Sequence, residues 1–155
     1  MIKAKPAFTV LLTVALLGIA ACGNDGDEGG GGANESGEPI LIKTHVAPLN
    51  AEGETFGEVV SGSTIGDSAF CAGGKFIDGP VEPPERSVER SFRCPGGVLT
   101  ISFTSTPPGV PQRSDWEVVT GLGDFEGLSG GGQMRAVSES KGGEGRETFT
   151  GTVTR

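Results

Sequence analysis

The stretch Ser87–Thr104 reads SVERSFRCPGGVLTISFT and decides the fold class. Alternate positions in its first half hold Val88, Arg90, Phe92 and Cys94. Alternate positions in its second half hold Leu99, Ile101 and Phe103. A period of two is typical of β-strands, and Cys94-Pro95-Gly96-Gly97 between the halves is a turn sequence. The stretch therefore predicts two successive strands.

Four further segments show the same period of two. Their alternating sets are Ile40-Ile42-Thr44-Val46, Trp116-Val118-Thr120, Met134-Ala136-Ser138 and Phe149-Gly151-Val153. Turn sequences occur at Thr106–Gly109 and at Lys141–Gly145, and no segment has a helical apolar repeat over three turns. Regularly spaced short strands predict an all-β barrel or sandwich. The last two strands are expected to form an antiparallel hairpin.

A family resemblance adds to this prediction. Trp116–Gly132 reads WEVVTGLGDFEGLSGGG and resembles a segment of the allene oxide cyclase-like barrel superfamily, which includes dirigent proteins and many actinobacterial secreted proteins. Glu147–Val153 resembles the closing strand of those proteins. The resemblance spans roughly Ile40–Arg155 and implies a small antiparallel barrel of about eight strands with an apolar or phenolic ligand in its mouth. No catalytic residue of those enzymes matches a position here.

The first 21 residues have the layout of a secretory signal peptide. Lys3 and Lys5 precede an uncharged run, Ala7–Ala21, of 15 residues, which is shorter than the roughly 18–20 residues that span a bilayer. The run ends in Ile19–Cys22, IAAC, which resembles the bacterial lipobox. We therefore predict cleavage before Cys22 and a lipid on its thiol, which places the protein at the cell membrane on the extracytoplasmic side. Secretion without lipid and an uncleaved helix are the alternatives.

Three parts of the chain follow from this: a signal peptide over 1–21, the lipidated cysteine with a tether over 22–39, and one β-barrel domain over 40–155. Gly23–Pro39 contains no aromatic residue and no aliphatic residue larger than Ala33, so we expect it to be disordered. Its Asp25, Asp27 and Glu28 lack the spacing of a calcium-binding loop.

Charge and cysteine content limit the partners. The mature chain has 20 acidic residues and, without Lys3 and Lys5, 10 basic ones, a net charge of −10, which argues against binding nucleic acid or an anionic membrane surface. Cys71 and Cys94 are the two remaining cysteines, and in an oxidising compartment they are expected to form a disulfide. With His45 as the single histidine, we expect no metal site and no cofactor.

Arg90 and Trp116 are the candidate ligand-binding residues. Arg90 shares a strand face with Val88 and Phe92, so we expect it to point into the barrel with a carboxylate partner. The other residues considered as site candidates are expected at the surface or at strand corners. These are His45, the acids Asp115, Glu117, Asp124 and Glu126, and the glycines Gly121, Gly123 and Gly127.

The sequence favours a lipid-anchored barrel that binds a small ligand or a cell-envelope component without catalysis. The first alternative is a cyclase- or dirigent-type enzyme acting on a small apolar molecule, and the second is a structural envelope protein. A wide cavity in the barrel that holds converging polar side chains, Arg90 and an acid among them, would favour the enzyme, and a dry interior filled with Leu, Ile, Phe and Val would exclude it.

Replacing Cys22→Ser should release the protein from membranes, because the thiol is the attachment point of the two acyl chains that make anchoring stable. Fractionation of cells that express the full chain measures this, with Gly32→Ser in the tether as the control that stays membrane-bound. Mass spectrometry that finds an unmodified Cys22 on the mature chain would contradict the prediction.

Overall fold

The computed structural model describes residues 37–84, 86–105, 112–139 and 143–155. The predicted signal peptide, Cys22, the acidic residues Asp25, Asp27 and Glu28, and the predicted turn Thr106–Gly109 lie outside the described residues. Strands are the regular elements of the described ranges. No helix in those ranges is long and apolar enough to span a membrane.

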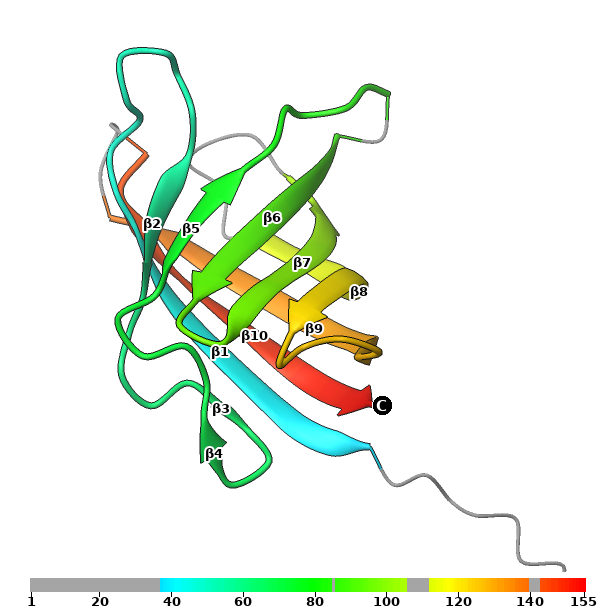
Figure 1. Cartoon of the computed structure of the whole chain (residues 1–155). Helices are drawn as coiled ribbons and strands as arrows, with labels where there is room; N and C mark the ends of the chain where they lie inside the picture. Colours follow the sequence, from blue (N-terminus) through cyan, green and yellow to red (C-terminus); the bar gives the residue numbers. More distant parts are fainter. Residues whose placement is uncertain (1–36, 85, 106–111, 140–142) are drawn as a thin grey trace, which may run out of the picture. The chain divides into compact units, whose positions relative to one another are not determined.

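An eight-stranded antiparallel barrel and one added hairpin make up the domain (Figure 1). The strands are β1 Glu38–Val46, β2 Phe56–Val59, β3 Thr64–Ile65, β4 Ser68–Ala69, β5 Lys75–Asp78, β6 Ser87–Cys94, β7 Gly97–Thr104, β8 Gln112–Gly123, β9 Ser129–Ser138 and β10 Gly145–Thr154. The order around the barrel is β1-β10-β9-β8-β7-β6-β5-β2, and β3 and β4 extend from β1. The predicted all-β barrel is confirmed, and its first strand begins at Glu38 rather than Ile40.

The pairing of the first and last strands closes the barrel. β1 pairs with β10 from Glu38↔Val153 to Val46↔Gly145. The other edge of β1 is shared, because its C-terminal part pairs with β2 and its N-terminal part with β3. Closure gives each of the eight strands a paired neighbour on both sides, which limits edge-to-edge aggregation. The predicted hairpin of the last two strands is also confirmed as β9 and β10.

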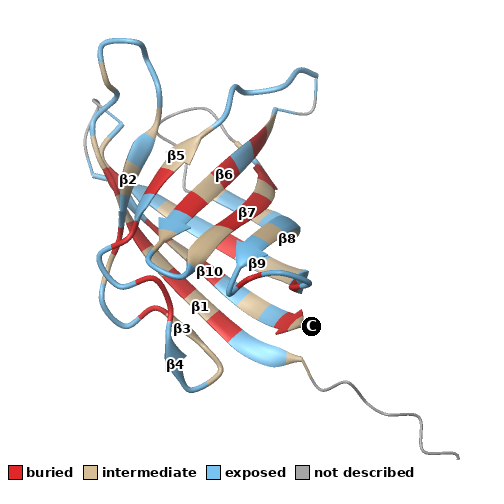
Figure 2. Cartoon of the chain, viewed as in Figure 1, coloured by how far each residue is buried: buried red, intermediate tan, exposed pale blue. Residues whose placement is uncertain are grey.

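Alternation along the strands separates the interior from the outer surface (Figure 2). The predicted alternating sets are buried or half-buried on four of the six strands. On β9, Met134 is buried and Ala136 half-buried, but Ser138 at the strand end is exposed.

On β8 the alternation itself is interrupted. There Ile101 pairs with Val118 while the preceding Thr100 pairs with Thr120, so Val119 is an extra residue. This β-bulge reverses the alternation, and Thr120 is exposed. The expectation that Thr120 shares a face with Trp116 and Val118 was therefore wrong.

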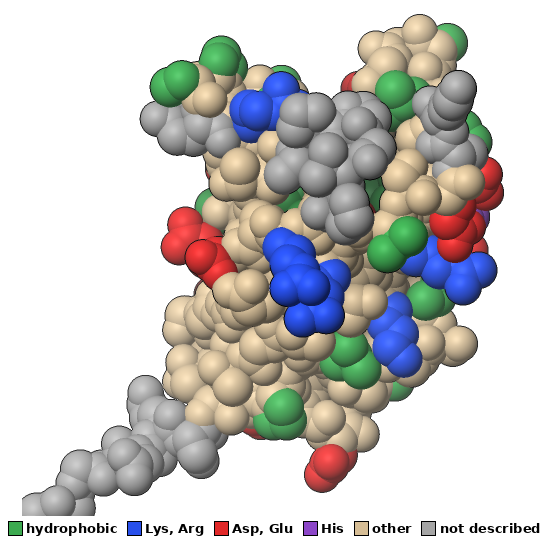
Figure 3. Space-filling view, turned by 180° about the vertical axis from the view of Figure 1, so that it is seen from behind, with side chains coloured by type: hydrophobic (Ala, Val, Ile, Leu, Met, Phe, Trp, Pro, Cys, Tyr) green, Lys and Arg blue, Asp and Glu red, His purple; other side chains and the backbone are tan. Residues whose placement is uncertain are grey.

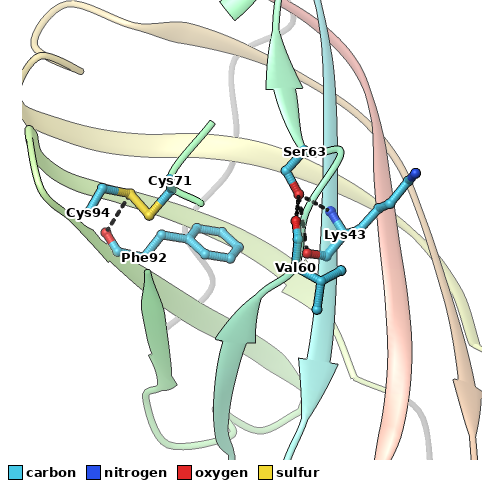
Figure 4. Close-up of a disulfide and its surroundings, with 6 residues drawn as sticks. All are labelled: Lys43, Val60, Ser63, Cys71, Phe92 and Cys94. Carbon is cyan, nitrogen blue, oxygen red and sulfur yellow. Dashed lines mark hydrogen bonds between the residues drawn. A yellow bond between two sulfur atoms is a disulfide. The ribbon is translucent and has the colours of Figure 1, made fainter. Parts of the chain in front are cut away.

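The barrel has a closed end and a mouth. At the closed end, where β1 begins and β10 ends, residues 60–74 and the turn after β8 cover the interior. Phe70 lies between Phe92 and Phe125, with ring centroids 5.7 and 5.6 Å away. The Ser63 hydroxyl accepts a hydrogen bond from the Lys43 amide at 2.9 Å and fixes this segment to β1 (Figure 4). The buried side chains of Phe70, Phe92 and Phe125 therefore fill the interior at this end.

A disulfide between Cys71 and Cys94 holds the closed end to β6 (Figure 4). Their Cα atoms are 4.9 Å apart and 23 positions apart in sequence. The predicted pairing is confirmed. Because the bridge lies beside Phe92 and Phe70, it fixes the segment that covers the core.

Removing this bridge with Cys71→Ser and Cys94→Ser together should lower the melting temperature by roughly ten degrees or more. The chain-entropy model gives about 3–4 kcal/mol for a loop of this length, and one kcal/mol corresponds to several degrees in a domain of this size. Calorimetry of the domain with and without reductant measures the effect, and reductant should leave the double variant unchanged. Equal melting temperatures of the oxidised protein and the double variant would contradict the prediction.

Candidate functional site

Arg90 lies inside the barrel, as its position between Val88 and Phe92 predicted. Its side chain is 1% exposed. The guanidinium carbon is 3.9 Å from the centroid of the Phe76 ring and 5.0 Å from that of Phe103. These aromatic faces attract the cation, but they cannot satisfy its five N–H donors.

Two carboxylates from distant parts of the chain provide the acceptors. Asp78 at the end of β5 accepts from Arg90 Nε at 2.6 Å and from Nη2 at 2.8 Å, the two-pronged geometry that suits a guanidinium. Glu147 on β10 accepts from Nη1, and its second oxygen lies 3.4 Å from Nη2. The Thr44 hydroxyl on β1 donates to Glu147 at 2.9 Å. Asp78, Arg90, Glu147 and Thr44, here called the mouth cluster, thus connect β5, β6, β10 and β1.

The mouth cluster contains one cation and two carboxylates, so it has a formal charge of −1 when all three are ionised. Burial lowers the pKa of Arg90, but the charge of Glu147 and the bonds and charge of Asp78 outweigh it, so its pKa lies above the ordinary value. Burial raises the pKa of Asp78, Arg90 lowers it and the charge of Glu147 raises it again, with a net upward direction. Arg90 therefore stays charged, and Asp78 binds a proton more readily than an ordinary aspartate does.

This raised pKa makes stability depend on pH. Between the ordinary value of 3.8 for Asp78 and its higher value in the folded state, the folded protein holds a proton that the unfolded chain releases. The free energy of unfolding contributed by Asp78 therefore decreases as the pH rises through that window.

A pocket of about 320 Å³ opens above the mouth cluster. Asp78, Arg90 and Glu147 line it together with apolar residues from several strands. Those apolar residues are Val46, Val88, Phe103 and Ala136 on the walls and Leu49, Val81 and Val137 at the rim. The rim residues are 52%, 46% and 63% exposed, and hydrophobic side chains stand at the projecting tips of this end in Figure 3. Ligand pockets commonly combine such walls with a few polar groups.

Arg86 is a second cation of the pocket, at its rim. It is exposed, and its Nε donates to the Ser105 carbonyl oxygen at 3.1 Å. Water screens a charge in this position far more than it screens the buried mouth cluster.

Trp116 does not line the pocket that contains Arg90. Its ring is 3% exposed and packs edge-on against Phe149, with centroids 6.4 Å apart, and its Nε1 donates to the Thr150 carbonyl at 3.1 Å. Trp116 borders a separate surface hollow between β7 and β8. The structure thus separates the two candidate ligand residues, and a ligand contact of Trp116 stays a prediction.

The remaining polar candidates lie where the sequence placed them. His45 is on the outer surface with its Nε2 3.4 Å from Glu144, and the four acids near Trp116 are exposed. Gly121 and Gly123 form the strand end: a Cβ on Gly121 would lie 1.8 Å from the Phe125 carbonyl oxygen, and Gly123 has a φ of 66°. Their function is close backbone packing and a tight turn rather than phosphate binding.

Asp78 and Glu147 were not among the sequence candidates. Glu147 had a visible signal, because it precedes Phe149 by two positions and so continues an inward-facing set. Asp78 had little signal, since β5 is only four residues long and alternation over four residues is weak evidence for a strand.

Comparison of the chain with protein-family models, with curated proteins and with solved structures gives no match. Chemically, the pocket can enclose a small apolar body, and the cluster can accept hydrogen bonds or hold a proton on Asp78.

Replacing Arg90→Met should destabilise the domain by about 3–5 kcal/mol at pH 8, because Asp78 and Glu147 then face each other without their cation. The loss should be smaller at pH 5, where protonation neutralises one carboxylate. Denaturant unfolding at both pH values measures this.

Arg93→Met is the matched control, since Arg93 is exposed on the same strand and such substitutions usually change stability by less than about 0.5 kcal/mol. Equal effects of the two variants, or a pH-independent loss for Arg90→Met, would contradict the prediction.

Proposed function

We propose that this chain is an exported, lipid-anchored β-barrel that binds a small, largely apolar molecule in its mouth above Arg90. The observation that carries the proposal is the pocket of about 320 Å³ with apolar walls and a buried charged cluster at its floor. Its size lies at the lower end of the range for ligand pockets, so the ligand is small. The resemblance to allene oxide cyclase-like barrels supports the same location.

Stability alone is a weak explanation for the mouth cluster. Well-packed apolar side chains in place of a buried ion set are often as stabilising or more so, and the closed half of this barrel is packed in that way. Ions kept beneath an accessible pocket are better explained by a ligand that contacts them.

The chain enters the barrel at the closed end. β1 begins at the closed end, opposite the pocket, and runs toward the mouth. The 15 residues Gly23–Gly37 that precede β1 would span roughly 19–23 Å on average as a flexible glycine-rich chain. A molecule in the extracytoplasmic solution or a cell-envelope component can then reach the pocket.

An enzyme acting on a small apolar molecule is the second candidate, favoured by the polar groups that converge in the pocket. Asp78, with its raised pKa, can donate a proton, and Arg90 beside it stabilises the resulting carboxylate. This candidate requires turnover that Asp78→Asn abolishes, whereas simple binding does not involve a chemical change.

Hexan-1-ol, a small neutral probe, should shift the methyl resonances of Val46, Val88 and Val137 in a two-dimensional NMR titration, because these residues line the pocket. Ala136→Trp should block the shifts by filling the mouth. Ala69→Trp on the exposed β4 strand is the matched control and should leave them intact.

Shifts that are confined to closed-end methyl groups such as those of Ile65, or shifts that persist unchanged in Ala136→Trp, would contradict a ligand site in the mouth. Backbone spectra that keep the closed-end signals in place show that each variant is folded.

A further inference from the structure

The donor and acceptor positions of the mouth cluster that are not used within the protein determine which polar group of a ligand can bind there. Arg90 uses Nε, Nη1 and Nη2 on the two carboxylates. The Thr44 hydroxyl donates its one proton to Glu147. A carboxylate offers about four acceptor positions, and Asp78 has only its two bonds from Arg90 among the described residues. The donors are thus largely used, and free acceptor positions remain.

The charge of the mouth cluster also favours a ligand that donates hydrogen bonds. Its formal charge of −1 is buried, since Asp78 and Glu147 side chains are 10% and 9% exposed. The described cations that line the same pocket are Arg90 from β6 and, at the exposed rim, Arg86. Charges interact more strongly in such surroundings than in water. A positive donor group above Asp78 would offset the excess charge, and a carboxylate there would add to it.

We propose that the natural ligand is a small amphiphilic amine, whose ammonium group lies against Asp78 and Glu147 and whose apolar body contacts Val88, Phe103 and Ala136. This inference rests on the proposed ligand site in the mouth. The exposed valine and leucine side chains at the rim extend the apolar path for that body. An ammonium beside Asp78 stabilises its carboxylate form, so amine binding and protonation of Asp78 oppose each other.

The test compares three probes of equal chain length on the intact barrel domain at pH 7.5: hexylamine, hexan-1-ol and hexanoate. Isothermal titration and the mouth methyl shifts of Val46 and Val88 measure affinity and location together. Hexylamine should bind at least tenfold more tightly than hexanoate, with hexan-1-ol between them. The preference for hexylamine should decrease as the pH falls through the pKa of Asp78, because the protonated carboxyl loses its charge.

Asp78→Asn should reduce the preference for hexylamine over hexanoate about tenfold or more, whereas Glu117→Gln, on the exposed face of β8, should leave it unchanged. If Asp78→Asn fails to fold, the ranking and its pH dependence in the native protein decide. Hexanoate that binds as tightly as hexylamine in the mouth overturns the amine inference and leaves the ligand site standing. Failure of all three probes to shift the mouth methyl groups overturns the proposed function itself.

Discussion

The ion set of Arg90 with Asp78 and Glu147 is the interaction on which the mouth of the barrel depends. Arg90 bonds to one carboxylate on the neighbouring strand β5 and to another across the barrel on β10, and Thr44 brings β1 into the same set. These residues lie up to 103 positions apart in the chain. Because a buried charge without its partner is costly, the cluster forms only when all four strands take their correct positions in the closed sheet.

The interior has two halves with different properties: the mouth, which contains this ion set, and the closed end. Around Phe92 the aromatic rings contact one another edge to face, and the disulfide fixes the covering segment, so that half is apolar and cross-linked. The mouth instead combines buried ions with exposed apolar side chains at the rim. A rigid closed end that supports a polar, accessible mouth is an arrangement suited to holding a small molecule in a defined orientation.

Alternation in the long strands was sufficient to predict much of this structure. The pattern in Ser87–Thr104 predicted β6, β7 and the inward direction of Arg90, and the two cysteines predicted the bridge. The strands β2 to β5 were not predicted, since they have only two to four residues and are defined by their partners rather than by their own pattern. Thr120 was placed on the wrong face because a bulge at Val119 depends on how β8 bends around the barrel, which a sequence period does not contain.

The partners in the candidate site also could not be predicted from the sequence pattern. That Arg90 needs a carboxylate follows from burying a cation, but which carboxylate it finds depends on strand order around the barrel. Glu147 comes next to Arg90 only because β10 and β6 face each other across the interior, and Asp78 only because β5 pairs with β6.

The most direct test of this account is a carbon-detected NMR titration of the Asp78 carboxyl group in the folded domain, first alone and then saturated with hexylamine. The pKa of Asp78 should lie above the ordinary carboxyl value when the mouth is empty, because burial and the charge of Glu147 outweigh Arg90. With the amine bound, the pKa should fall, since the ammonium stabilises the carboxylate. An Asp78 pKa at or below the ordinary value, unchanged by the amine, would contradict the account.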